Sequence, residues 1–206
     1  YRKKYKERDA RGSREKAGHC LREEYLLSEE KTELILDLYQ YQQEQLGKPA
    51  PASAGVYIGI PFCPTRCLYC SFTSNQSGPK QIEDYLSALF HESRFAGKAM
   101  KEEGSFAESI YIGGGTPTSL TAKQLEDLLS LTQASFASSE LKEFTVEAGR
   151  PDTITPEKLR VLRAFGVGRI SINPQTMHQK TLDLIGRSHT VAQTREAFDM
   201  AHKAGI

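Results

Sequence analysis

An alternation of short apolar segments with amphipathic helical patterns begins near residue 55, and it constrains the fold more than any other feature of the chain. The apolar segments are predicted strands at residues 56–60, 109–112, 143–148 and 169–173. Helical patterns follow them, beginning near Gln81, Thr121, Thr155 and Thr190. Strands joined through helices in one orientation form a parallel sheet with right-handed crossovers and helices on its faces. The sequence therefore predicts an α/β fold.

Signals at the helix ends support this division of the chain. Thr121 with Gln124, and Thr190 with Gln193, form capping-box patterns that mark two helix starts. A fifth strand is expected to begin only at Ile206. Because four βα units are too few to close an eight-stranded barrel, we expect a partial (β/α) barrel that ends after about four units.

Three of the four cysteines lie within eight residues, directly after the first predicted strand. Cys63, Cys67 and Cys70 have the spacing C-x3-C-x2-C, and thiolates favour iron, iron–sulfur or zinc sites over magnesium or calcium. Three cysteines on a four-iron cluster leave one iron open to a small molecule, whereas a structural zinc site needs four ligands. Cys20 lies far upstream and is predicted not to be a ligand. A zinc site that uses Cys20 or a histidine remains the alternative.

The charge balance and the apolar runs limit the classes of partner. The chain of 206 residues carries 27 basic and 26 acidic residues, for a net charge of +1, so no overall field favours nucleic acid or a membrane surface. No apolar run approaches the roughly 20 residues that a membrane span needs. We expect a cytoplasmic protein with a small-molecule partner, and in a reducing compartment clustered cysteines indicate metal binding rather than disulfides.

The first 54 residues differ in composition from the rest and are predicted to form an N-terminal extension, with the core domain at 55–206. Residues 1–24 are rich in Lys and Arg and poor in large apolar residues, which predicts a solvated or weakly ordered leader. A helix is expected from Ser28. The apolar residues that share one of its faces are Leu34, Ile35, Leu38 and Leu46. Residues 47–53 are rich in Pro and Ala and are the predicted linker.

Residues that could bind a ligand lie at or just after the end of each later strand. Gly113, Gly114 and Gly115 come directly after the second strand, where they leave the backbone uncovered for a ligand or simply form a tight turn. Glu147 lies in the third strand and Gln175 follows the fourth. The carboxyl ends of parallel strands meet at one edge of the sheet, where α/β folds build their sites. The sequence therefore predicts one site that includes the cysteine loop.

Taken together, these motifs resemble the radical S-adenosylmethionine (SAM) superfamily, and more narrowly the oxygen-independent coproporphyrinogen III oxidase family. The segments that carry the resemblance are residues 57–63, 113–118, 147, 169–175 and 184–187. The resemblance extends from about Val56 to Ile206, and it implies the partial barrel of the radical SAM fold with an N-terminal helical extension.

The resemblance implies a four-iron, four-sulfur cluster bound by Cys63, Cys67 and Cys70, with the remaining iron chelated by the amino and carboxylate groups of SAM. The residues implied as contacts to SAM are Tyr57, Tyr69, Gly114, Gly115, Thr116, Glu147, Gln175 and Arg187. No residue is assigned a catalytic role, because the cofactor carries the radical.

The reaction implied by the resemblance starts with cleavage of SAM to methionine and a 5'-deoxyadenosyl radical. The radical removes a hydrogen from a propionate of coproporphyrinogen III, and loss of carbon dioxide and one electron leaves a vinyl group. Two such events give protoporphyrinogen IX. An electron donor such as flavodoxin or ferredoxin is implied. Relatives with the same cluster motif carry haem instead, so a haem chaperone is the alternative.

Three features depart from the family pattern, and the role of a fourth residue has two alternatives. Ser71 stands where some oxidases have another cysteine, Asn173-Pro174 replaces a common Gly-Val pair, and Gly149-Arg150-Pro151 forms an insertion. Arg66, inside the cysteine loop, is either a ligand for a substrate carboxylate or a solvated charge. The departures bear more on the identity of the substrate than on the radical chemistry.

Overall fold

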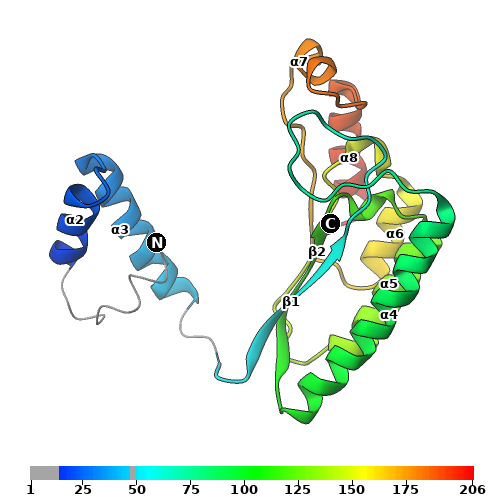
Figure 1. Ribbon diagram of the computed structural model, residues 1–206, viewed down its shortest axis with the longest axis horizontal. Coiled ribbons are helices and arrows are strands. Elements are labelled where there is room, and N and C mark those ends of the chain that lie inside the picture. Colours follow the sequence, from blue (N-terminus) through cyan, green and yellow to red (C-terminus); the bar gives the residue numbers. More distant parts are fainter. Residues whose placement is uncertain (1–13, 47–49) are drawn as a thin grey trace. The chain divides into compact units, whose positions relative to one another are not determined.

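The computed structural model describes residues 14–46 and 50–206, and the side chain of Leu46 is not among the described groups (Figure 1). The chain divides into two compact units, the first ending at Pro51 and the second running from Ala52 to Ile206. Each unit is described by itself. Within the described residues, no helix is both long and apolar enough to cross a membrane.

The first unit is a pair of helices, α2 (Arg14–Glu23) and α3 (Glu29–Leu46). Residues 14–23 were expected to belong to a weakly ordered leader, and that expectation is wrong. Leu21 is buried, and a Cβ on Gly18 would lie 3.5 Å from Leu36, so a small residue lets the two helices approach closely. Arg14 also pairs with acidic residues of α3. Residues 1–13 of the expected leader lie outside the described residues.

The start of α3 agrees with the sequence, but its predicted apolar face is exposed. The Ser28 hydroxyl accepts a hydrogen bond from the backbone N–H of Lys31 at 3.3 Å, which caps the first turn. Thr32 and Leu36 are buried, whereas Leu34, Ile35 and Leu38 are exposed. The apolar residues therefore share a face without forming the core of this unit. Of the predicted linker, residues 47–49 lie outside the described residues.

The second unit is built on a parallel sheet, as predicted. The strands are β1 (Ser53–Ile60), β2 (Phe106–Gly114), β3 (Glu143–Glu147) and β4 (Arg169–Ser171). They lie side by side in chain order, and each neighbouring pair is parallel. This is the partial barrel expected from four βα units.

The fourth strand is shorter than the sequence predicted, and the fifth strand, expected to begin at the last residue, stays a prediction. β4 ends at Ser171 rather than at residue 173. Pro174 has no N–H to donate to a ladder, and the Asn173 side chain accepts a hydrogen bond from the N–H of Gln175 at 2.9 Å, which favours a turn. The N–H of Ile206 bonds back to the carbonyl of Ala201, so Ile206 closes the preceding helix.

Three helices connect the strands, and two more follow β4. The connecting helices are α4 (Pro79–Glu102), α5 (Ala122–Phe136) and α6 (Pro156–Ala164), and those after β4 are α7 (Gln179–Leu184) and α8 (Val191–Lys203), with 3-10 turns at Pro117–Ser119 (η1) and Pro151–Thr153 (η2). Figure 1 shows α4, α5 and α6 in a row beside the sheet, and their contacts agree. The predicted capping boxes at Thr121 and Thr190 are confirmed. Helix α7 was not predicted, because six residues are too few for a clear period.

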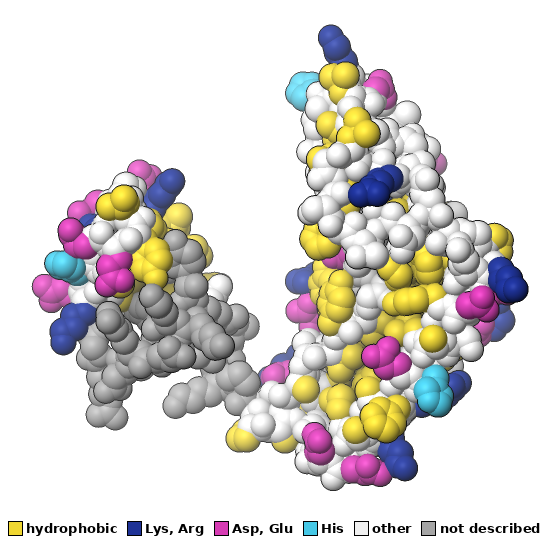
Figure 2. Space-filling model, in the orientation of Figure 1, with side chains coloured by type: hydrophobic (Ala, Val, Ile, Leu, Met, Phe, Trp, Pro, Cys, Tyr) yellow, Lys and Arg dark blue, Asp and Glu magenta, His cyan; other side chains and the backbone are white. Residues whose placement is uncertain are grey.

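The strands present alternate residues to two faces of the sheet. Ile58, Ile110, Ile112 and Val146 belong to the apolar core that the sheet forms with the helices. Their neighbours along the strands, such as Tyr57 on β1, point to the other face. Figure 2 shows hydrophobic side chains gathered on the visible surface of this unit, with charged side chains mostly at its margins. Tyr57 on that other face is 64% exposed, so the helices do not cover it.

Candidate cofactor site at the strand ends

The cysteine loop follows β1 and is closed by hydrogen bonds at its two ends. The N–H of Cys63 donates to the carbonyl of Asn75 at 3.1 Å, and the N–H of Asn75 donates to the carbonyl of Pro61 at 2.7 Å. Inside the loop, the N–H of Cys70 bonds to the carbonyl of Cys67 at 3.1 Å. These contacts keep the three cysteines of the motif within one tied loop at the end of β1.

The triple glycine packs against this loop. The N–H of Gly115 donates to the carbonyl of Ile60 at 2.8 Å. A Cβ on Gly115 would lie 2.6 Å from the carbonyl oxygen of Phe62 and 3.1 Å from Sγ of Cys63, and one on Gly114 would lie 2.9 Å from the oxygen of Ile60. Such distances are not tolerated, and Gly114 also has φ of +112°. The glycines are therefore needed for close approach of two backbone segments.

The thiols of the loop interact with one another and with neighbouring polar groups. Sγ of Cys63 lies 3.2 Å from the hydroxyl of Thr116. Burial raises the pKa of the Cys63 thiol, the Thr116 hydroxyl and the Arg150 charge oppose that rise, and the charges of Cys70 and Cys67 add to it.

The donor set fits an iron–sulfur cluster in its chemistry, although its side chains are not arranged as a finished ligand set. Across residues 14–46 and 50–206, no three His, Cys, Asp or Glu side chains have the arrangement of a metal site. Cys63 faces Thr116, and Cys67 accepts a hydrogen bond from Arg150.

Glu147 is held at the end of β3 by groups from β2. The Tyr111 hydroxyl donates to Oε1 of Glu147 at 2.7 Å, and the N–H of Gly114 donates to Oε2 at 3.2 Å. The hydrogen bond to Glu147, together with burial, raises the pKa of Tyr111 to about 12. Tyr57 stacks on Tyr111 with ring centres 5.9 Å apart and is itself 64% exposed. Its ring offers an open aromatic surface beside a fixed carboxylate.

Arg187 connects the cysteine loop with the loop after β3. Its Nη1 donates to the carbonyl of Gly149 at 2.7 Å, and its Nε donates to the hydroxyl of Tyr69 at 3.2 Å. The residue is buried. Among the residues that the structure describes, Nη2 donates to none, and this nitrogen is left for an anion. A bidentate bond to a carboxylate would displace Tyr69 or Gly149.

Gln175, in contrast, is not brought into contact with the other predicted residues. It is exposed, and its hydrogen bond to Asn173 uses its backbone N–H. Its φ of +58° lies in the left-handed region, which costs energy for a residue with a side chain. The structure thus places Gln175 beyond the end of β4 with its side chain open to solvent.

Three residues of this region were not singled out from the sequence for the roles they have here. Tyr111 supports Glu147, and its position two residues before the glycines was the available signal. Arg150 is buried and bonds to several loops, although an arginine in a loop is ordinarily exposed. His189 is fully buried, and within the described part of the chain neither ring nitrogen has a hydrogen-bond partner.

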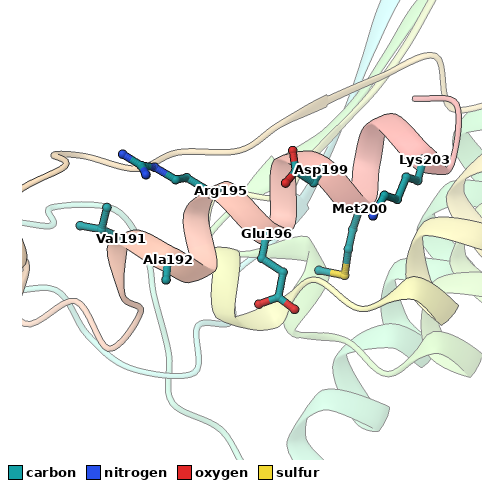
Figure 3. A pocket seen from close by; sticks show the side chains of 7 residues that line it. All are labelled: Val191, Ala192, Arg195, Glu196, Asp199, Met200 and Lys203. Carbon is teal, nitrogen blue, oxygen red and sulfur yellow. The ribbon is translucent and has the colours of Figure 1, made fainter.

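A cavity of about 600 Å³ lies elsewhere, along α8. Its lining residues are Val191, Ala192, Arg195, Glu196, Asp199, Met200 and Lys203 (Figure 3). All of them come from one helix, and none belongs to the predicted site. A second cavity, of about 570 Å³, includes Cys63 and Lys158 in its lining and lies against the outer side of the cysteine loop.

Comparison with known proteins decides the family. The family model described as "Radical SAM superfamily" matches residues 57–206. The chain belongs to the radical SAM superfamily. Members of this superfamily use a four-iron, four-sulfur cluster and SAM, which agrees with the thiols and the strand-end groups described above.

Named relatives are similar to this chain over part of their length. The "Oxygen-independent coproporphyrinogen-III oxidase-like protein HemZ" of Bacillus subtilis is 39% identical over 94% of this chain and 40% of its own. The "Heme chaperone HemW" of the same organism is 38% identical over 73% of this chain and 39% of its own. The chain thus spans about two fifths of the length of these curated relatives.

A solved structure shows the same fold. Coproporphyrinogen III oxidase (HemN) from Escherichia coli, titled a radical SAM enzyme, matches with a TM-score of 0.66 over 80% of this chain and 37% of that protein. The two are 24% identical, so the likeness shows the fold alone. The partial barrel inferred from the strand alternation is therefore the radical SAM architecture.

Proposed function

We propose that this chain forms the cofactor-binding part of a radical SAM enzyme, with Cys63, Cys67 and Cys70 as ligands of the cluster. The observation that carries the proposal is the junction at the ends of β1, β2 and β3. There Gly115 is bonded to the end of β1, Thr116 is bonded to the carbonyl of Phe62 in the cysteine loop, and Gly114 is bonded to Glu147. A cofactor that touches both the cluster and the strand ends would fit this junction. The cluster supplies the electron that cleaves the sulfonium bond of SAM.

The residues around the junction suit the polar groups of SAM. Glu147 accepts hydrogen bonds from the amino group or the ribose hydroxyls, and Arg187 offers Nη2 to the carboxylate. Carbonyls of Gly114 and Gly115, and the hydroxyl of Thr116, lie at the same strand end. For Tyr57, whose ring is exposed, the proposed role is an aromatic contact.

Two further residues complete the proposed cofactor site. Tyr69 holds Arg187 through its hydroxyl, and its ring shields the cluster or contacts adenine. Gln175 reaches the cofactor only if the exposed turn after β4 closes over it.

The proposed substrate is coproporphyrinogen III. It is supported by the relative named as an oxidase-like protein, which is similar along 94% of this chain. In the proposed reaction each of two propionates loses one hydrogen atom to the 5'-deoxyadenosyl group, one carbon dioxide, and one electron to an acceptor, and becomes a vinyl group. A flavodoxin or ferredoxin in the cytoplasm would reduce the cluster.

The second candidate is a haem chaperone that binds SAM and haem without oxidising a porphyrinogen. Relatives named heme chaperones, including one 38% identical to this chain, favour it. The two candidates share the cluster and the SAM site, and they differ in the molecule that reaches it.

The test is anaerobic reconstitution of the protein with iron and sulfide, followed by reduction in the presence of SAM. We expect about four irons per chain and release of 5'-deoxyadenosine. Stoichiometric zinc and no 5'-deoxyadenosine would contradict the proposal. Coproporphyrinogen III is then added and the product is followed by mass. Loss of two carboxyl groups supports the oxidase, whereas retention of added haem without turnover supports the chaperone.

A further inference from the structure

Arg150 is a buried cation that joins three loops at the carboxyl ends of the strands. It lies in the loop after β3 and is 3% exposed. Nη1 donates to the carbonyl of Thr65 at 3.3 Å and to Sγ of Cys67 at 3.8 Å. Nη2 donates to the hydroxyl of Thr65 at 2.9 Å and also to the hydroxyl of Ser188. One side chain thus connects the cysteine loop with the segment that carries Arg187.

A carboxylate on the far side of the guanidinium compensates this charge. Asp152 accepts from Nε of Arg150 at 3.2 Å and from Nη2 at 3.3 Å, and Ser188 donates to Asp152 at 3.0 Å. Burial opposes ionisation of Asp152, but the hydrogen bonds and charge of Arg150 hold the pKa of Asp152 below its usual value. The pair is therefore ionic, with its positive end toward Cys67.

We propose that Arg150 is a positioning residue for the cluster, which fixes the cysteine loop and raises the reduction potential of the cluster through its hydrogen bond to Cys67. The inference rests on the proposed ligand role of Cys67. It deepens the proposed function, because it names the group that sets how readily the enzyme accepts its electron.

The physical basis is the charge of the two redox states. Reduction adds one negative charge to a cluster held by thiolates, and hydrogen bonds and positive charges near the sulfurs stabilise the reduced state more than the oxidised one. At a buried position this effect is only weakly screened by solvent. Asp152 counteracts it, since a negative charge beside Arg150 reduces the positive potential at Cys67.

These opposing charges give a test in which two variants move in opposite directions. The cluster is reconstituted anaerobically in wild type, Arg150→Gln and Asp152→Asn, and its midpoint potential is measured by titration with a low-potential reductant. We expect a more negative potential in Arg150→Gln and a less negative one in Asp152→Asn. If Arg150 merely braced the fold, both variants would lower the melting temperature and neither would move the potential in this pattern.

Arg66→Gln is the matched control. It removes the same charge from the cysteine loop itself, but at an exposed position where solvent screens the charge. We expect a smaller change of potential than in Arg150→Gln, and an equal change would overturn the role of the hydrogen bond to Cys67.

Arg150→Lys keeps the test decisive if Arg150→Gln does not fold. Lysine retains the charge but cannot reach Thr65, Cys67 and Ser188 together. Its potential should lie below that of wild type, and a value equal to wild type would contradict the proposal. Failure of wild type itself to bind iron would refute the proposed cluster site, which distinguishes that outcome from failure of this inference.

Discussion

The end of β3 and the end of β4 hold their predicted cofactor contacts in different ways. At β3, both carboxylate oxygens of Glu147 accept hydrogen bonds from β2 residues. At β4, Gln175 lies on an exposed turn in a strained backbone conformation. In the sheet that the structure describes, β3 has a neighbouring strand on each side, whereas β4 pairs with β3 alone and has three residues. The end of β3 is preorganised for a ligand, and the end of β4 is not.

The largest effect that tests this comparison is loss of the cluster. Cys67→Ala removes a ligand from the loop that is tied to the inner strands, and we expect reconstituted protein to bind no four-iron cluster. Cys20→Ala, in α2 of the first unit, should leave iron and sulfide content unchanged. Both contents and the visible absorption spectrum are measured after anaerobic desalting. Equal loss in the two variants would show that the site extends beyond the strand ends.

The tight packing at the inner strand ends predicts a loss of stability when a methyl group is added. In Gly115→Ala the new Cβ would clash with the Phe62 backbone, and we expect the free energy of unfolding to fall by about 1–3 kcal/mol. Gly149→Ala is the control, since a Cβ there meets no atom within 4 Å. Its change should stay within about 0.5 kcal/mol. Both variants are measured by urea denaturation. Equal shifts of their unfolding midpoints would contradict the comparison.

Affinity for SAM gives a direct contrast between the two strand ends. Glu147→Gln removes the charge from a fixed acceptor, and we expect the dissociation constant of SAM to rise at least about tenfold, because hydrogen bonds to charged groups contribute about 1.5–3 kcal/mol. Gln175→Ala removes a neutral group that must first be ordered, so its effect should be about threefold or less. Calorimetry on reconstituted protein measures both. A larger loss in Gln175→Ala would place the main contact at the end of β4.

The same contrast shows what the sequence could and could not predict. The parallel sheet followed from strands such as 56–60 with helices between them, because alternation and helix caps are local signals. The end of β4 was placed two residues too late, since the turn formed by Asn173 and Pro174 competes with the ladder. The helix at 14–23 was missed because its burial depends on Leu36, far along the chain, rather than on its own charged composition.

Some features of the candidate site were likewise predictable from the sequence and others were not. The cysteines and glycines were found because their spacing is a sequence property, and the family resemblance added Glu147 and Arg187. The contacts that hold them were not predictable. Tyr111 and Arg150 act through side chains that meet across strands and loops, and no periodicity marks such meetings. The sequence suggested that the glycines leave the backbone open to a ligand or form a tight turn, whereas Gly115 is required by close packing against Phe62.

The smallest expected effect is the pH dependence of stability that His189 causes. It tests whether solvent is excluded from the buried residues near the end of β4. Burial lowers the pKa of His189, and the charges of Arg187 and Arg150 lower it further. Asp152 and the backbone of Pro174 oppose them, although the contact with Pro174 does not have the geometry of a hydrogen bond. The folded protein therefore keeps the ring neutral, while the unfolded chain takes up a proton near pH 6.5. Stability should be unaffected by this residue above that pH, and should fall as the pH decreases below it, by at most about 1.4 kcal/mol per pH unit.

The measurement is urea denaturation at pH 7.5 and pH 5.5 for wild type and His189→Leu. Both proteins contain the same other titratable groups, so the difference between them reports mainly on the histidine. We expect His189→Leu to lose less stability between the two pH values, because leucine fills the apolar space without a group to protonate. An equal loss would mean that water or an acceptor reaches the ring. The contrast between the ends of β3 and β4 would then hold for the buried residues near the end of β4 as well as for the exposed Gln175.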